Sequence, residues 1–149
     1  MIEWISDSAE KTQELGERFA GEYLVTGSVV ALFGDLGAGK TQFVKGVARA
    51  LGIDDRELTS PTFALANEYE CRLPDGTDTT LFHLDCYRFE KPEELLELGI
   101  EDYLQPQYAM TIVEWPERIK NYLPDDAVRI HFRVLDDEMR QITLEEVAL

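Results

Sequence analysis

The chain is poor in cysteine and in long apolar runs. Its only cysteines, Cys71 and Cys86, are too few for a disulfide framework and show no metal-ligand spacing. No apolar stretch approaches the ~20 residues that cross a bilayer, and the first residues lack the basic start and apolar segment of a secretory signal. We therefore expect a cytoplasmic protein that is not associated with a membrane.

Basic residues are also scarce. Fourteen lysines and arginines stand against thirty aspartates and glutamates, which leaves a formal net charge of −16 at pH 7. Such a surface repels nucleic acid, because binding requires Lys and Arg to neutralise phosphates. The charge serves either solubility alone or a protein partner with a basic face, and direct binding to RNA or DNA is the less favoured interpretation.

Repeats, linkers and low-complexity segments are absent as well, so we expect a single domain over residues 1–149. What the chain does contain is Gly-Asp-Leu-Gly-Ala-Gly-Lys-Thr at 34–41, which fits the phosphate-binding pattern G-x-x-x-x-G-K-[S/T]. An apolar stretch at 28–33 predicts a buried strand before it, and apolar residues at helical spacing predict a helix that ends near Gly52. Strand, glycine loop and helix are the context that this motif requires.

The residue types of the motif explain its chemistry. Gly37 and Gly39 allow backbone conformations closed to other residues, so that the N–H groups of the loop form an anion nest at a helix N-terminus. Lys40 is expected to reach the β- and γ-phosphates, and Thr41 to offer its hydroxyl to Mg²⁺.

The remaining segments favour an α/β fold. A helix is expected from Ser8, with Ser8 or Asp7 as its N-cap, and it places the polar Thr12 among apolar positions. Strands are expected at 1–5 (an edge strand), 63–71, 79–85, 110–113, 126–134 and 139–147, with a short helix at 91–99. Because strands and helices alternate and the last strands pair as a hairpin, we expect a mixed, mainly parallel sheet flanked by helices.

A nucleotide hydrolase also needs acidic groups to hold Mg²⁺ and to orient water. Asp85 and Glu114 each end an apolar strand and are the candidates for this task. Which of the two contacts the metal directly is left open by spacing.

Other polar residues lie near these acids in the sequence. His83 should share one side of its strand with Asp85, either as a hydrogen-bonded structural residue or as a proton shuttle. Arg88 is able to hold a phosphate or a carboxylate, and Thr62 lies in a segment similar to a nucleotide-sensing switch. Trp115 is either a core residue or an aromatic surface beside the nucleotide.

Together these segments resemble one family. They are GDLGAGKT at 34–41, SPTF at 60–63, HLDCYR at 83–88 and EWP at 114–116. In this order they resemble the bacterial tRNA threonylcarbamoyladenosine (t6A) biosynthesis ATPase family TsaE, formerly YjeE. The match runs from 12–16 to Arg140, and the last two motifs are far more specific than the glycine loop.

The resemblance implies a Mg²⁺-dependent ATPase that works with the threonylcarbamoyl transferase and its non-catalytic paralogue, and through them on tRNA. It implies that Thr41 and Glu114 ligate Mg²⁺, with Asp85 nearby, and that 37–42, Ala38 and Gln42 included, holds the phosphates. It also places Thr12 and Arg140 beside the nucleotide. The predicted site residues are therefore Thr12, 37–42 (with Lys40 and Thr41), Thr62, Asp85, Glu114, Trp115 and Arg140.

Three alternatives stay open at this point. A small P-loop metabolite or nucleoside kinase usually needs an arginine-rich lid, and the nine arginines of this chain are scattered. A GTPase would need an Asn-Lys-x-Asp segment, which the chain lacks. A nucleotide-bound interaction module would differ by negligible turnover. We expect weak ATPase activity from the isolated protein, strengthened by its partners, because no arginine finger is evident.

Overall fold

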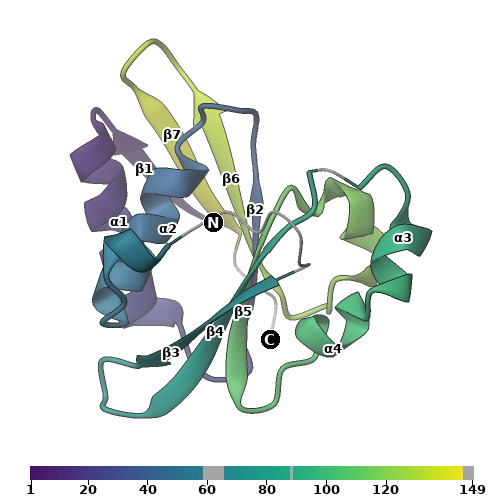
Figure 1. The fold of residues 1–149 in the computed structure, drawn as a ribbon. Coiled ribbons are helices and arrows are strands. Elements are labelled where there is room, and N and C mark those ends of the chain that lie inside the picture. Colours follow the sequence, from purple (N-terminus) through teal and green to yellow (C-terminus); the bar gives the residue numbers. More distant parts are fainter. Residues whose placement is uncertain (59–65, 88, 146–149) are drawn as a thin grey trace.

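The computed structural model describes residues 1–58, 66–87 and 89–145. They form a seven-stranded mixed sheet with helices on both faces, as predicted (Figure 1). The strands are β1 (Ile2–Ser6), β2 (Val29–Phe33), β3 (Ala66–Arg72), β4 (Asp78–Asp85), β5 (Ala109–Glu114), β6 (Val128–Val134) and β7 (Arg140–Glu145). The helices are α1 (Ala9–Tyr23), α2 (Lys40–Ala50), α3 (Pro92–Glu97) and α4 (Ile100–Leu104), with 3₁₀ turns η1 (Asp55–Glu57) and η2 (Pro116–Tyr122).

The strand order β1-β7-β6-β2-β5-β4-β3 places parallel strands at the centre and antiparallel strands at both edges. β6, β2, β5 and β4 pair in parallel. β1, β7 and β3 join in antiparallel pairs, and β1 is an edge strand, as predicted. The carboxyl ends of parallel strands meet at one edge, so the segments that follow β2, β4 and β5 are brought together.

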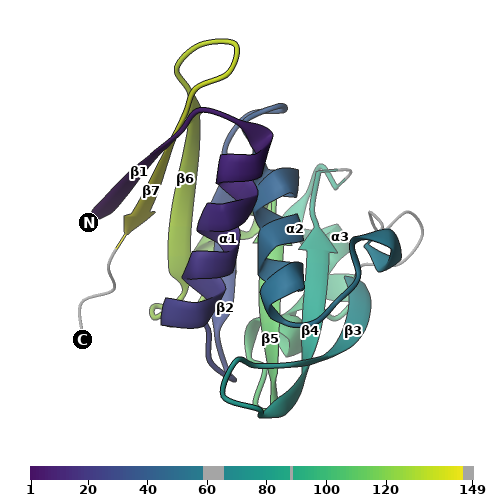
Figure 2. The same cartoon turned by 90° about the vertical axis from the view of Figure 1, so that its left-hand side faces the viewer.

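The sheet has a separate hydrophobic core on each face. Along β2, Val30 and Leu32 belong to one core, whereas Val29 and Ala31 belong to the other, because successive side chains of a strand point to opposite faces. Helices α1 and α2 cover the first face (Figure 2), and α3, α4 and η2 cover the second. This double coverage explains why β2 and β5 are apolar throughout most of their length.

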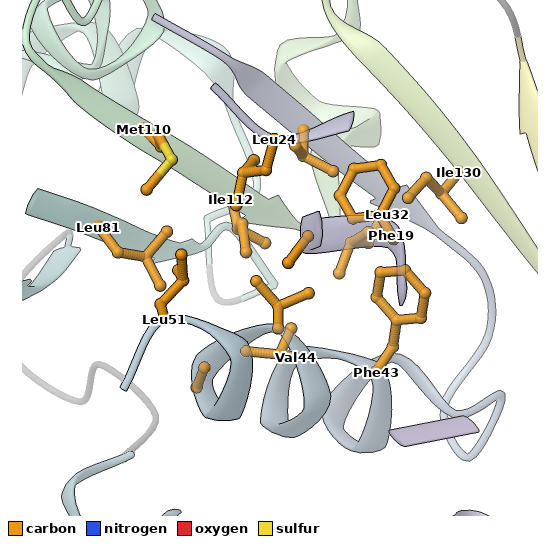
Figure 3. Close-up of a cluster of buried hydrophobic side chains, with 14 of the residues drawn as sticks. Phe19, Leu24, Leu32, Phe43, Val44, Leu51, Leu81, Met110, Ile112 and Ile130 are labelled. Atoms are coloured by element: carbon orange, nitrogen blue, oxygen red, sulfur yellow. The ribbon is translucent and has the colours of Figure 1, made fainter. Parts of the chain in front are cut away.

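The first core sits between α2 and the central strands (Figure 3). Phe43 and Val44 of α2 are buried there against residues such as Leu32 and Ile112. Helix α1 closes the same core through Phe19, whose ring lies 5.6 Å from that of Phe43 between centroids. The start of α2, where the glycine loop ends, is therefore anchored on a rigid support.

Helices α1 and α2 cross at very short distance because each carries a glycine at the crossing. A methyl group at Gly16 would overlap the carbonyl oxygen of Phe43, and one at Gly46 would overlap that of Gln13. This close approach brings Thr12 of α1 against Gly39 of the glycine loop, where a Cβ would lie 3.5 Å from Cγ2 of Thr12.

The structure departs from the sequence-based prediction in a few details. The short helix ends at Glu97, and α4 follows after Gly99, whose φ of +83° starts a new direction of the chain. Five residues are too few to show helical periodicity, so α4, like η1 and η2, was not predicted. Thr62 and Arg88 lie outside the described residues. No helix in the described ranges is long and apolar enough to cross a membrane, and a single domain stays a prediction.

Candidate nucleotide site

A cavity of about 730 Å³ opens at the carboxyl ends of the central strands. Four parts of the chain line it: the start of α1, the glycine loop, the ends of β4 and β5, and the β6–β7 hairpin. The lining residues are 7–10, Thr12, 36–42, Asp85, Glu114, Trp115, Asp137, Glu138 and Arg140. Apart from Thr62, every predicted site residue is therefore on the wall of this one cavity.

The glycine loop has the backbone conformation that an anion nest requires. Gly37 and Gly39 have φ values of +79° and +104°, which residues with a Cβ rarely adopt. Gly39 is the N-cap of α2 and makes no side-chain cap, so the first amides of the helix stay available to an anionic ligand. Eleven helical residues follow, and their dipole adds to the attraction for negative charge.

Lys40 is the cation of the loop and is only 5% exposed. Its Nζ donates a hydrogen bond to the carbonyl oxygen of Gly34 and lies 3.4 Å from the ring centroid of Trp115. Burial lowers the pKa of Lys40, and the nearby carboxylate of Glu114 opposes that shift. In this arrangement the ammonium group is held inside the loop by two uncharged partners, a carbonyl and an aromatic face.

Trp115 has an unusual backbone. Its φ of +56° and ψ of +54° make it the one non-glycine residue with positive φ in the described ranges. This conformation costs on the order of 1 kcal/mol and clusters at functional sites. The indole is held by Lys40 on the cavity side and by Tyr87, whose ring centroid lies 4.8 Å away.

The two predicted acids are neighbours. Asp85 and Glu114 are register partners at the ends of the parallel strands β4 and β5. Glu114 is 8% exposed, and its Oε2 lies 2.6 Å from Nε2 of His83. Asp85 is half-buried, and its Oδ1 accepts a hydrogen bond from the backbone N–H of Tyr87 at 2.9 Å.

The side chains near the loop fit Mg²⁺, the metal that the resemblance implies. The carboxylates of Asp85 and Glu114 and the hydroxyl of Thr41 line one cavity, and oxygen atoms are the ligands that Mg²⁺ prefers. No group of three or more His, Cys, Asp or Glu side chains in the described part of the chain could hold a metal by itself. A magnesium ion here would be shared with nucleotide phosphates, as is usual for this ion.

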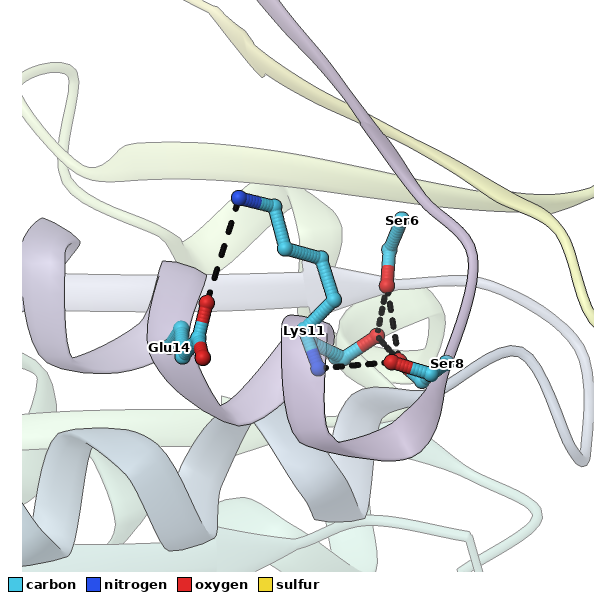
Figure 4. A network of polar contacts seen from close by, with 5 residues as sticks. Ser6, Ser8, Lys11 and Glu14 are labelled. Atoms are coloured by element: carbon cyan, nitrogen blue, oxygen red, sulfur yellow. Dashed lines mark hydrogen bonds and ion pairs between the residues drawn. The ribbon is translucent and has the colours of Figure 1, made fainter.

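Thr12 borders the cavity with its hydroxyl already bonded inside the protein. Its Oγ1 lies 2.7 Å from Oγ of Ser6 and 3.2 Å from the carbonyl oxygen of Ser8, which also accepts from Ser6. Figure 4 shows this group of contacts at the start of α1, where Ser8 Oγ caps the helix by accepting from the N–H of Lys11. Its methyl group lies next to Gly39 of the loop, at van der Waals distance from the position that a Cβ would take there.

The β6–β7 hairpin reaches the glycine loop through Arg140. Its Nε donates to the carbonyl oxygen of Gly37 at 3.2 Å, and its Nη1 donates to carbonyl oxygens of the hairpin itself. Gln42, at the other side of the loop, accepts a 2.6 Å hydrogen bond from Gln13 of α1. The loop is thus tied to elements that lie far from it in the sequence.

Sequence reasoning missed several lining residues. Asp7, Glu10, Asp137 and Glu138 add four exposed carboxylates to the cavity wall. Tyr87 belongs to one of the motifs, yet nothing in the sequence indicates that its ring packs against the indole. No local signal marks these residues, because α1, the hairpin and the loop meet only in the folded chain.

The two cysteines take no part in the cavity wall. Burial raises the pKa of Cys86 to about 12 and that of Cys71 to about 11. Both are therefore neutral thiols at physiological pH.

Comparisons with known proteins agree on one family. The family model described as Threonylcarbamoyl adenosine biosynthesis protein TsaE matches residues 6–142. The tRNA threonylcarbamoyladenosine biosynthesis protein TsaE of Treponema pallidum is 42% identical over 140 residues, or 94% of this chain and 97% of that protein. The protein of the same name from Bacillus subtilis is 37% identical over 146 residues, or 98% of this chain and 86% of that protein.

A solved structure gives the same result. The crystal structure of Bacillus subtilis YdiB resembles this fold with a TM-score of 0.76 and 33% sequence identity. The similarity covers 99% of this chain and 86% of that one, so it includes the cavity and both layers of helices.

Proposed function

This chain belongs to the threonylcarbamoyl adenosine biosynthesis protein TsaE family, and from that premise we propose that it is a Mg²⁺-dependent ATPase of the t6A37 modification machinery. It hydrolyses ATP in complex with the threonylcarbamoyl transferase and the transferase's non-catalytic paralogue, in the cytoplasm. Hydrolysis supports turnover of that complex, and tRNA is acted on indirectly through it.

One observation carries this proposal. The glycine loop, Lys40 and the carboxylates of Asp85 and Glu114 converge on a single cavity, although they follow or end three separate strands. A phosphate nest, a cation and paired acids are the parts that phosphoryl transfer requires. A glycine loop without the acids would support nucleotide binding alone.

Each residue then has a distinct task. The amides of 37–42 bind the phosphates, and Lys40 exchanges its bond to the Gly34 carbonyl for the β- and γ-phosphate oxygens. Thr41 and Glu114 would hold Mg²⁺ with Asp85 beside them, and a bound ion would supply charge neutralisation at the transferring phosphoryl group. Asp85 and Glu114 also orient the attacking water.

Three further residues complete the nucleotide site. Trp115 lines the cavity with its indole next to Lys40 and serves as an aromatic surface beside the nucleotide. Thr12 and Arg140 border the nucleotide where they support the glycine loop. Thr62 is proposed to sense the γ-phosphate, from its place in the sequence alone.

The cavity wall also supports dependence on a partner. Among the described lining residues, Arg140 is the one arginine, and its Nε and Nη1 are already bonded to backbone carbonyls. Four exposed carboxylates on the same wall disfavour the approach of a polyphosphate. Slow turnover in isolation is therefore expected, and a partner supplies the free cationic side chain that the described cavity wall lacks. The same lining gives no support to a kinase with an arginine-rich lid.

The test is to measure phosphate release by the isolated protein, then with the transferase and its paralogue, each with and without Mg²⁺. We expect slow release alone, a clear increase with both partners, and loss in the Lys40→Ala variant. Fast release that is indifferent to the partners would contradict partner dependence. Phosphate transfer to a small metabolite instead of water would support the kinase.

A further inference from the structure

His83 is a buried polar residue to which the proposed function assigns no task. It lies on β4, two residues before Asp85 and on the same side of the strand. Its Nε2 is 2.6 Å from Oε2 of Glu114 on the neighbouring strand, and the two residues are 6% and 8% exposed. The contact therefore joins the two strands that carry the acids of the cavity.

The surroundings indicate which atom donates in this contact. Glu114 lies near the buried ammonium group of Lys40, and the proposed function assigns it to Mg²⁺ as a carboxylate ligand. An ionised carboxylate only accepts hydrogen bonds, so the proton belongs to Nε2 of His83. The neutral ring then presents a bare lone pair at Nδ1.

The second ring nitrogen of His83, Nδ1, indicates that the residue has a role beyond stabilising the fold. Nδ1 of His83 is buried and has no hydrogen-bond partner in the described part of the chain. A histidine that only stabilises the fold normally satisfies both nitrogens, because an unpaired buried polar atom costs free energy. Here the ring makes its polar contact with Glu114 through Nε2 alone.

We propose that His83 is a positioning residue that holds the Glu114 carboxylate through Oε2 and leaves Oε1 for a divalent cation. This inference rests on the proposed function, in which Glu114 binds Mg²⁺. Groups that orient a metal ligand in this way typically contribute about 10- to 100-fold to metal affinity or activity. A hydrogen bond at 2.6 Å between two buried groups is suited to that task.

The experiment measures metal binding, not turnover. Mn²⁺ replaces Mg²⁺ as an electron paramagnetic resonance probe on the full chain loaded with a non-hydrolysable ATP analogue. Nucleotide affinity is measured in parallel in the presence of EDTA, and folding is checked by thermal unfolding. The variants are His83→Leu, which removes the donor, and His83→Gln, whose amide N–H restores one near the position of Nε2.

Thr79→Val is the matched control. Thr79 lies on the same strand and the same side as His83, is 9% exposed, and donates a hydrogen bond to the carbonyl oxygen of Tyr108. It does not line the cavity. This variant therefore reproduces the loss of a buried hydrogen bond without touching Glu114.

We expect His83→Leu to weaken Mn²⁺ binding about 10- to 100-fold while metal-free nucleotide affinity changes by less than about 2-fold. His83→Gln should recover most of the loss, and Thr79→Val should behave as the unmodified chain. Unchanged Mn²⁺ affinity in His83→Leu, an equal loss in His83→Gln, or an equal loss in Thr79→Val would each overturn the inference.

A second measurement does not depend on any variant at position 83. The chain has two histidines, so ¹⁵N resonances of His83 are assigned by comparison with a His131→Gln variant. The proton is expected on Nε2, and a proton on Nδ1 would overturn the assignment of the donor. If the unmodified chain binds neither nucleotide nor Mn²⁺, the proposed function itself fails. If the unmodified chain binds both and substitution of His83 leaves Mn²⁺ affinity unchanged, only the role of His83 is refuted.

Discussion

The two walls of the cavity differ in burial, charge and origin. The inner wall consists of Lys40, Asp85, Glu114 and Trp115, where the carboxyl ends of parallel strands meet the glycine loop. The outer wall consists of the start of α1 and the β6–β7 hairpin, with four exposed carboxylates and Arg140. Lys40 and Glu114 are less than a tenth exposed, whereas the carboxylates of the outer wall face solvent.

This difference in burial sets how strongly each charge contributes to nucleotide binding. Away from water the interaction between two charges is several times stronger than at the surface, where salt also screens it. Residues of the inner wall should therefore control binding and chemistry. Residues of the outer wall should tune affinity by small factors that depend on ionic strength.

The largest effect is expected for Lys40→Ala. Removing the buried cation should lower nucleotide affinity and partner-stimulated turnover by about 100-fold or more, because no other group in the inner wall supplies positive charge. Isothermal titration and phosphate release measure the two quantities. Lys45→Ala on the same helix is the control, since Lys45 does not line the cavity. Equal losses in both variants would show that the helix itself was damaged.

Glu114→Gln should have the next largest effect and should separate chemistry from binding. The amide keeps the size of the side chain but removes the charge that Mg²⁺ requires, so turnover should fall about 100-fold. Metal-free nucleotide affinity should stay within about 3-fold, because phosphates bind to the glycine loop. Retention of full Mg²⁺-dependent turnover would remove Glu114 from the metal site.

Arg140→Ala should weaken nucleotide binding by only about 3- to 10-fold, the value of one hydrogen bond. The variant loses the tie from Nε to the carbonyl oxygen of Gly37, so the glycine loop is less well supported. Affinity is measured at several salt concentrations, with Arg133→Ala on β6 as an exposed control. A loss of affinity as large as that of Lys40→Ala would mean that Arg140 contributes to nucleotide binding as much as a buried residue of the inner wall.

The smallest effect, and the only one of opposite sign, is expected for the double variant Asp137→Asn, Glu138→Gln. Removing two exposed negative charges from the cavity rim should raise nucleotide affinity about 2-fold at low salt, and the gain should vanish as salt increases. Titration at two ionic strengths checks this. A drop in affinity would mean that these carboxylates contact the nucleotide directly.

Much of the inner wall could be predicted from local patterns. The sequence around Lys40 contains its own strand, loop and helix signals, and the apolar runs before Asp85 and Glu114 mark strand ends. What local pattern does not contain is the pairing of β4 with β5, which makes the two acids neighbours. The contact of His83 with Glu114 depends on the same pairing, so spacing could not separate a structural histidine from a positioning one.

Local patterns did not predict how the outer wall is assembled, for a related reason, and only the family resemblance placed Thr12 and Arg140 beside the nucleotide. Arg140 and Gly37 are separated by 103 positions, and the contact forms only after β7 has paired with β6. Local patterns also did not predict the contact between Trp115 and Lys40 in the inner wall, because the indole reaches Lys40 only from a backbone with positive φ. Nothing in the neighbouring residue types indicates that conformation for a tryptophan.

By itself, the sequence determined the α/β class, the glycine loop and the strand ends that carry the acids, because each of these is encoded by residues within a few positions of one another. Only the tertiary structure decided which of those groups meet, how deeply they are buried and which neighbours orient them. The physical reason is that strand register and helix packing arise from long-range burial of apolar surface, and the strength of every charge in the cavity follows from that burial.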